Sequence, residues 1–145
     1  FVIFQKKDAL QWVNALNCLS VGNQNWAMDT SLLICVCANK KFKHNGNENK
    51  WSQYDTGAAS QNLSIQATAL GLMVHQMGGF DVDKSRNNFK IPNRYMPMAV
   101  ISVGYQLPED KIPEEIKERE YSHRVRNSIS ENFFEGEWEN PIQVS

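Results

Sequence analysis

An ordered series of short motifs between Tyr54 and Tyr105 constrains the fold of this chain more than any other feature. A stretch of small residues runs from Asp55 to Gly71, and the pair Gly78-Gly79 follows it. A short polar stretch then leads to the apolar run Met98–Gly104. The first stretch has the spacing of a helix, and the last run is typical of a strand covered on both faces. The order therefore predicts a long buried helix, a turn, a short helix and a buried strand.

Local signals predict where these helices begin and end. Asp55 is placed to cap the long helix, because its carboxylate can accept the free N–H groups of a first turn. Gly71 is placed to end that helix, since glycine suits the position after a helical C-terminus. Asp81 is predicted to cap the short helix, and Ile91-Pro92 to stop it. Further along, Pro113 followed by two glutamates predicts another helix start.

Outside this region the pattern alternates between apolar runs and polar stretches. Phe1–Phe4 and Ser31–Ala38 are apolar and rich in β-branched residues, which predicts two strands inside a core. Lys6–Asn17 has apolar residues near helical spacing and predicts an amphipathic helix. Val21–Asp29, rich in Gly and Asn, is predicted to be a loop, and Asn39–Lys50 an exposed loop with a tight turn.

Composition excludes several classes of function. The 145 residues suffice for one core, and 41% hydrophobic with 21% charged residues is ordinary for a globular domain. A formal net charge of −1 gives no global electrostatic basis for binding nucleic acid or an anionic membrane. No apolar run approaches the roughly 20 residues that a membrane span needs. Nucleic acid and membrane are therefore not expected as partners.

The three cysteines, Cys18, Cys35 and Cys37, bear on compartment and on metal binding. An odd number without regular spacing argues against a secreted disulfide framework and favours the reducing cytoplasm. Cys35 and Cys37 are two positions apart in a predicted strand, which places both thiols on one face. No further ligand stands at a workable spacing, so no metal site is predicted. Both residues are predicted to be small apolar core residues.

The ordered motifs resemble the FMN-dependent nitroreductase family. The resemblance rests on Tyr54–Leu63, Ala69–Leu72, Met77–Asp81, Ile91-Pro92 and Ala99–Tyr105. It implies an α+β fold in which helices flank a mixed, mostly antiparallel sheet, and it implies a homodimer whose interface includes the long helix. One nitroreductase-like domain is expected over residues 1–145. The family's N-terminal Arg-x-Ser-x-Arg pattern has no counterpart here, so the chain is expected to be N-terminally incomplete.

The resemblance also implies cofactor-binding residues around the glycine pair. Gln76 and Met77 are expected to pack beside the flavin ring. Gly78 and Gly79 are expected to present backbone N–H groups near its reactive edge, because the backbone of glycine can take unusual angles and approach a flat ligand closely. The alternative is that Gly78-Gly79 only forms the turn before the helix that Asp81 caps.

Near the C-terminus, Arg124 and Arg126 are the candidates for binding the FMN phosphate. In an extended segment the two side chains would point the same way, with Val125 turned toward the protein. Guanidinium groups carry permanent charge and paired planar donors that suit phosphate. The family places an Arg/Lys-x-Arg pattern here. The alternative is a solvated basic turn that pairs with a nearby carboxylate: Glu118, Glu120 or Glu131.

The function that the resemblance implies is an FMN-dependent oxidoreductase that passes electrons from NAD(P)H to nitroaromatic, quinone or related small-molecule acceptors. Such an enzyme needs no dedicated acid–base residue. His44, His75 and His123 have no nucleophile or metal partner at a known spacing, so loop and packing roles are expected for them. Three alternatives remain: a reductive dehalogenase on the same fold, a non-enzymatic flavin-binding or storage protein, and a flavin-free structural module.

Overall fold

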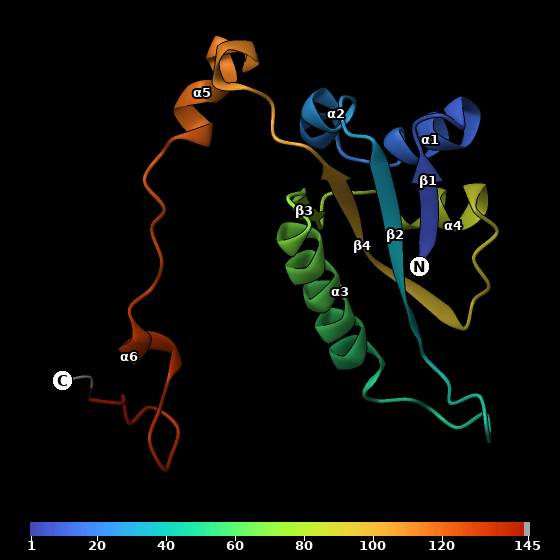
Figure 1. Ribbon diagram of the computed structural model, residues 1–145. Helices are drawn as coiled ribbons and strands as arrows, with labels where there is room; N and C mark the ends of the chain where they lie inside the picture. The colour runs from blue at the N-terminus through green and yellow to red at the C-terminus, as the bar shows by residue number, and fades with distance from the viewer. Residues whose placement is uncertain (144–145) are drawn as a thin grey trace. The chain divides into compact units, whose positions relative to one another are not determined.

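A computed structural model describes residues 1–143, and the chain divides into two compact units, Phe1–Gln106 and the part from Leu107 onward. Each unit is described by itself. The expectation of one domain over residues 1–145 stays a prediction. The elements of the first unit, drawn in Figure 1, are β1 (Val2–Gln5), α1 (Ala9–Leu16), α2 (Val21–Ala27), β2 (Leu32–Asn39), α3 (Ser52–Ala69), β3 (Met73–Met77), α4 (Val82–Asn88) and β4 (Tyr95–Gly104).

The strands form one four-stranded sheet in the order β1-β2-β4-β3, and every neighbouring pair is antiparallel. The α+β class with a mostly antiparallel sheet flanked by helices is therefore confirmed. β1, β2 and β4 are the predicted apolar strands, although β4 begins at Tyr95 and includes Pro97. The register between β2 and β4 shifts after Val36, where Ala99 is followed in the pairing by Pro97, which leaves Met98 as the extra residue of a bulge.

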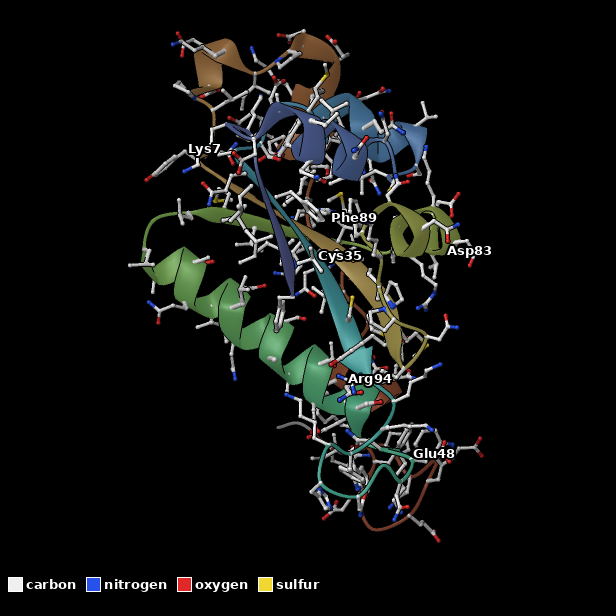
Figure 2. The ribbon with its side chains drawn as sticks, turned by 90° about the vertical axis from the view of Figure 1, so that its right-hand side faces the viewer. Lys7, Cys35, Glu48, Asp83, Phe89 and Arg94 are labelled. Carbon is white, nitrogen blue, oxygen red and sulfur yellow. The ribbon has the colours of Figure 1, made fainter. Side chains whose placement is uncertain are left out.

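The two faces of the sheet carry two separate hydrophobic clusters, because successive side chains of a strand point to opposite faces. Leu33 and Cys35 of β2 join the cluster that contains Trp12 of α1 and Ala27 of α2. Residues of β2 on the other face join Ala67 of α3 in the second cluster. Figure 2 shows this layering, with α3 on one side of the sheet and α1 and α4 on the other.

Two elements differ from the sequence-based expectation. Val21–Ala27 is the helix α2, where a loop was predicted. Its glycine and asparagines are poor helix formers, but Ala27 is fully buried and contacts with the core outweigh local propensity. Strand β3 was not predicted, because its sequence Met-Val-His-Gln-Met lacks a continuous apolar run. It lies at an edge of the sheet, where only one neighbour pairs with it.

Helix α3 confirms one predicted boundary and corrects two other expectations. Gly71 has a φ of 76°, and the Leu72 N–H donates to the Ala67 carbonyl at 3.0 Å, so the predicted C-terminal glycine is confirmed. Asp55 is not the cap, because the helix begins at Ser52 and Asp55 lies within its first turn. Nor is the helix buried on most of its surface. In this chain only three of its residues are buried: Ser52, Ser60 and Ala67.

Helix α4 begins as predicted, since the Asp81 carboxylate accepts a hydrogen bond of 2.8 Å from the Lys84 N–H. In the second unit the elements are a 3-10 helix (Glu109–Lys111), α5 (Glu114–Glu120) and α6 (Ile129–Asn132), with an isolated bridge between Phe134 and Pro141. The start of α5 directly after Pro113 confirms that prediction. Among residues 1–143, none of the helices combines the length and the apolar character that crossing a membrane requires.

Candidate functional site

The Gly78-Gly79 turn joins β3 to α4 and is fastened to the segment between α1 and α2. The Gly79 carbonyl accepts two hydrogen bonds, from the Ser20 N–H at 2.9 Å and from Asn23 Nδ2 at 3.0 Å. Next to it, the Asp81 N–H donates to the Cys18 carbonyl at 2.7 Å. Between these bonds, Leu19 and Phe80 form an isolated antiparallel β-bridge. The turn is therefore fixed by residues that are distant in the sequence.

The carbonyl oxygens of this turn accept hydrogen bonds, whereas its N–H groups have no acceptor in the described part of the chain. Neither the Gly78 N–H nor the Gly79 N–H donates a hydrogen bond to any residue that the structure describes, and both glycines are exposed. The Gly78 carbonyl accepts from the Phe80 N–H at 3.1 Å. Two adjacent free N–H groups on a fixed turn can donate to a polar ring edge.

The two glycines differ in what an added side chain would meet. Neither has a positive φ, so unusual backbone angles are not what this turn requires of them. A Cβ at Gly79 would lie 2.9 Å from Ser20 Oγ and 3.0 Å from Asn23 Nδ2, so these side chains would have to shift. A Cβ at Gly78 would meet no atom within 4 Å. The space beside Gly78 is open to an incoming ligand, so this segment fits the flat ring that the sequence suggests.

The other two residues predicted beside the ring lie on opposite faces of β3. The Met77 side chain is 2% exposed and belongs to the core cluster with Leu33 and Ile91. Gln76 is exposed and donates from Nε2 to Ser64 Oγ of α3 at 3.1 Å. Met77 therefore supports the turn from inside the core, and only Gln76 presents its side chain at the surface.

Sequence reasoning missed the contribution of α2 to this region. Ser20 and Asn23 were assigned no role, because both contact Gly79 across a long stretch of sequence, 56 residues in the case of Asn23. The ring of His75, two residues before Met77, packs edge-on against Trp26 of α2, with 4.9 Å between the ring centroids. This agrees with the packing role expected for His75.

Arg124 and Arg126 belong to the second unit and lie between α5 and α6 in a segment without regular secondary structure. Both are exposed, and Arg126 Nη1 donates to the Val125 carbonyl at 2.8 Å. Neither guanidinium forms an ion pair with a carboxylate in the described part of the chain. The expectation that Val125 turns toward the protein is wrong, since 76% of it is exposed. Two unpaired guanidiniums remain suited to phosphate.

The cysteine pair of β2 is the one place in the described chain where pKa values are clearly shifted. The Sγ atoms of Cys35 and Cys37 are 3.9 Å apart. A hydrogen bond from Cys35 lowers the pKa of Cys37 to about 7, with smaller contributions from the N-terminal amino group and Arg86, while burial opposes the change. The same hydrogen bond and burial raise the pKa of Cys35. Both residues pack in the core cluster, as predicted.

Comparison with known proteins gives matches over most of the chain. The model of the Nitroreductase family matches residues 3–105. An uncharacterized 15.4 kDa protein of Mycolicibacterium smegmatis is 35% identical over 127 residues, which are 86% of this chain and 82% of the relative. Residues 124 and 126 lie beyond the family match.

Solved structures share the fold. A crystal structure described as an oxidoreductase containing FMN matches with a TM-score of 0.85 and 29% identity, over 96% of this chain and 71% of that chain. An FMN-dependent nitroreductase from Clostridium difficile matches with a TM-score of 0.60 and 20% identity, over 88% of this chain and 74% of that chain. At that identity the second match shows the fold alone.

Proposed function

The chain belongs to the nitroreductase family, and from this premise we propose that it is an FMN-dependent oxidoreductase. In this proposal it passes electrons from NAD(P)H to a nitroaromatic, a quinone or a related small-molecule acceptor. The similar FMN-containing oxidoreductase supports the choice of cofactor. Three free cysteines are in keeping with a reducing cytoplasm.

The observation that carries the proposal is the pair of unbonded amides at Gly78 and Gly79, beside open space. When bound, the flavin supplies the redox chemistry, because it accepts a hydride from reduced nicotinamide and passes electrons on to the acceptor. In this proposal the protein orients the flavin and polarises its ring. The amides donate to the ring edge that gains electron density, and the bonds from Ser20 and Asn23 keep them aimed without reorganisation.

Arg124 and Arg126 are proposed to hold the phosphate of FMN. Each guanidinium offers a permanent charge and paired donors, and neither is neutralised by an acidic side chain in the part that the structure describes. The alternative pairing with Glu131 is not favoured, because that carboxylate accepts from the Ser128 N–H and hydroxyl in the capping box of α6.

A homodimer through α3 is the proposed assembly. Tyr54, Ala58, Ile65 and Ala69 fall on one face of this helix by their spacing, and all four are exposed. The opposite face, with Ser60 and Ala67, packs on the sheet. An exposed face with apolar residues on a long helix is typical of a protein–protein interface, and most homo-oligomers are twofold dimers.

The assembly proposal is tested by the mass of the protein in solution. Size-exclusion chromatography with light scattering is expected to give twice the chain mass for the native protein. Ile65→Asp places a charge on the exposed face and is expected to shift the mass toward that of the monomer. The control is Gln66→Asp, which adds the same charge to the same helix outside this face. A native protein that is monomeric would overturn the proposal.

The function is tested by titrating the purified protein with FMN and following the visible absorption and the quenching of flavin fluorescence. Bound flavin is expected to bleach with NADH or NADPH under anaerobic conditions and to recover its colour when a quinone or a nitroaromatic is added. A protein that leaves the spectrum of added FMN unchanged would contradict cofactor binding. Bound flavin that neither nicotinamide reduces would contradict the enzyme while leaving a flavin-binding protein.

A further inference from the structure

Cys35 and Cys37 lie side by side on β2, an interior strand of the sheet. Cys35 is in the core, and Cys37 is closer to the surface. Their Sγ atoms are 3.9 Å apart. Cys35 is fully buried, in the middle of the sheet on the same side as Phe89 (Figure 2). Cys37 is partly exposed at the margin of the same cluster. A small ion can therefore reach the pair from the Cys37 side.

The strand geometry disfavours a disulfide between these two cysteines. Both cysteines are free. Residues two apart in a strand have Cα atoms about 6.6 Å apart, which is near the upper end of the roughly 4.4–6.8 Å range that disulfides occupy. β2 pairs with β1 on one side and β4 on the other, so its backbone cannot readily shorten to relieve the strain. Two thiols thus remain held within contact of each other.

Two thiols at this separation can share one metal ion. Metal–sulfur bonds of about 2.3 Å span at most about 4.6 Å, so small side-chain rotations bring both sulfurs into bonding distance. Thiolates select soft ions. Four-coordinate zinc is not favoured, because no cluster of three or more His, Cys, Asp or Glu in residues 1–143 could hold a metal. We propose that Cys35 and Cys37 form a two-thiolate site for a soft monovalent metal ion of the Cu⁺ type.

The surrounding charge suits such a complex. Two thiolates and one monovalent cation carry a net charge of −1. Arg86 of α4 is hydrogen-bonded to Tyr95 of β4, the strand whose Pro97 pairs with Cys37. Its guanidinium is held in place by donating to the backbone carbonyls of Ile91 and Pro92, each at 3.1 Å, and of Tyr95 at 2.9 Å. A fixed positive charge can therefore offset the charge of the complex without a further ligand.

The test is an anaerobic titration of the whole chain with Cu⁺ in competition with bicinchoninate, a chromophoric Cu⁺ chelator. One ion per chain is expected, and both Cys37→Ser and Cys35→Ala are expected to weaken binding at least tenfold. Cys18→Ser is the matched control. Cys18 is a buried thiol that donates to the Asn14 carbonyl and lies outside the pair, so this variant is expected to bind like the native chain.

A second measurement avoids reliance on the buried variant, whose folding is checked by circular dichroism. In the native chain, one equivalent of Cu⁺ is expected to slow the alkylation of Cys37 by iodoacetamide at least tenfold. Unchanged alkylation of Cys37 would overturn the proposal. Undiminished Cu⁺ affinity in Cys37→Ser, or an equal loss in Cys18→Ser, would overturn it as well. None of these outcomes depends on whether the chain binds FMN.

Discussion

The glycine turn is proposed to bind a flavin ring and the arginine pair a phosphate, and the two regions are built in different ways. The turn at Gly78-Gly79 is fastened by hydrogen bonds from Ser20 and Asn23 and stands directly after the buried Met77. Arg124 and Arg126 lie in an exposed segment without regular secondary structure, where the Arg126 guanidinium donates to the carbonyl of its own neighbour Val125.

The difference indicates how each region is prepared for its ligand. A turn whose amides are already aimed pays little ordering entropy on binding, so its hydrogen bonds contribute nearly in full. An exposed arginine must give up side-chain freedom when it binds, and its charge is screened by salt. We therefore expect the turn to determine how the ring is oriented and the arginines to determine how tightly the phosphate form binds. Three predictions test this division.

The largest effect is expected for Arg124→Ala/Arg126→Ala. Hydrogen bonds to charged groups are worth about 1.5–3 kcal/mol each, so the loss of even one should weaken FMN binding by roughly 10- to 100-fold. Riboflavin lacks the phosphate, and its affinity should stay within about threefold. The measurement is fluorescence titration with each ligand. The urea midpoint should not move, because neither side chain is buried.

The control for this variant is Arg119→Ala, which removes a positive charge in the same unit but within α5. It should leave both affinities close to native. Raising the salt concentration should weaken FMN binding in the native chain much more than in the double variant. Equal losses for FMN and riboflavin would show that the arginines act on the structure of the protein and not on the phosphate.

The next effect separates the two glycines. Gly79→Ala places a Cβ 2.9 Å from Ser20 Oγ and 3.0 Å from Asn23 Nδ2, and overpacking of this kind costs about 1–3 kcal/mol. A lower urea midpoint is expected, together with weaker binding of both FMN and riboflavin. Gly78→Ala adds a methyl group where no atom lies within 4 Å. It should keep native stability and lose affinity for both ligands, because the methyl group occupies the space assigned to the ring.

Each glycine variant serves as the control for the other. A Gly78→Ala protein with native stability and native flavin affinity would show that the open space beside this residue is not where the ring binds. A Gly79→Ala protein with native stability would show that Ser20 and Asn23 can move aside freely, and that the turn is less firmly held than its hydrogen bonds indicate.

The fold could be predicted where the signal is local or where apolar residues run together. Gly71 and Asp81 were found because each acts on the backbone within a few residues. The strands β1, β2 and β4 were predicted because apolar residues run together in them. Helix α2 was not, because its stability comes from tertiary contacts: Ala27 is buried in the core and Trp26 packs on His75.

The candidate site could be predicted only in part, for the same physical reason. The glycine pair is visible as a motif. The hydrogen bond that holds it in place is not visible in the sequence. This bond, from Asn23 to Gly79, links positions 56 residues apart, and no spacing rule indicates it. The exposure of α3 was also misjudged. Small residues on a helix predict close packing, but they do not tell whether the neighbour is the chain's own sheet or a second copy.

The smallest effect is expected for Asn23→Ala, which tests whether the anchoring bond itself matters. The variant removes the donor to the Gly79 carbonyl at 3.0 Å, while the Ser20 N–H still donates to the same oxygen. One lost hydrogen bond costs about 0.5–1.5 kcal/mol, so flavin affinity should fall by roughly 2- to 12-fold. Asn25→Ala on the same helix is the matched control, because that side chain is exposed.

A readout of orientation distinguishes an effect on the turn from a general loss of stability. If Asn23 keeps the amides aimed at the electron-rich edge of the ring, Asn23→Ala should lower the midpoint potential of the bound flavin, because the reduced form loses more stabilisation than the oxidised form. Asn25→Ala should leave the potential unchanged. A potential that is equal in both variants, beside a lowered affinity in Asn23→Ala, would mean that the turn contributes shape without polarising the ring. The difference between the preorganised turn and the exposed arginine segment would then affect only the affinity for the ligand and not the redox potential of the flavin.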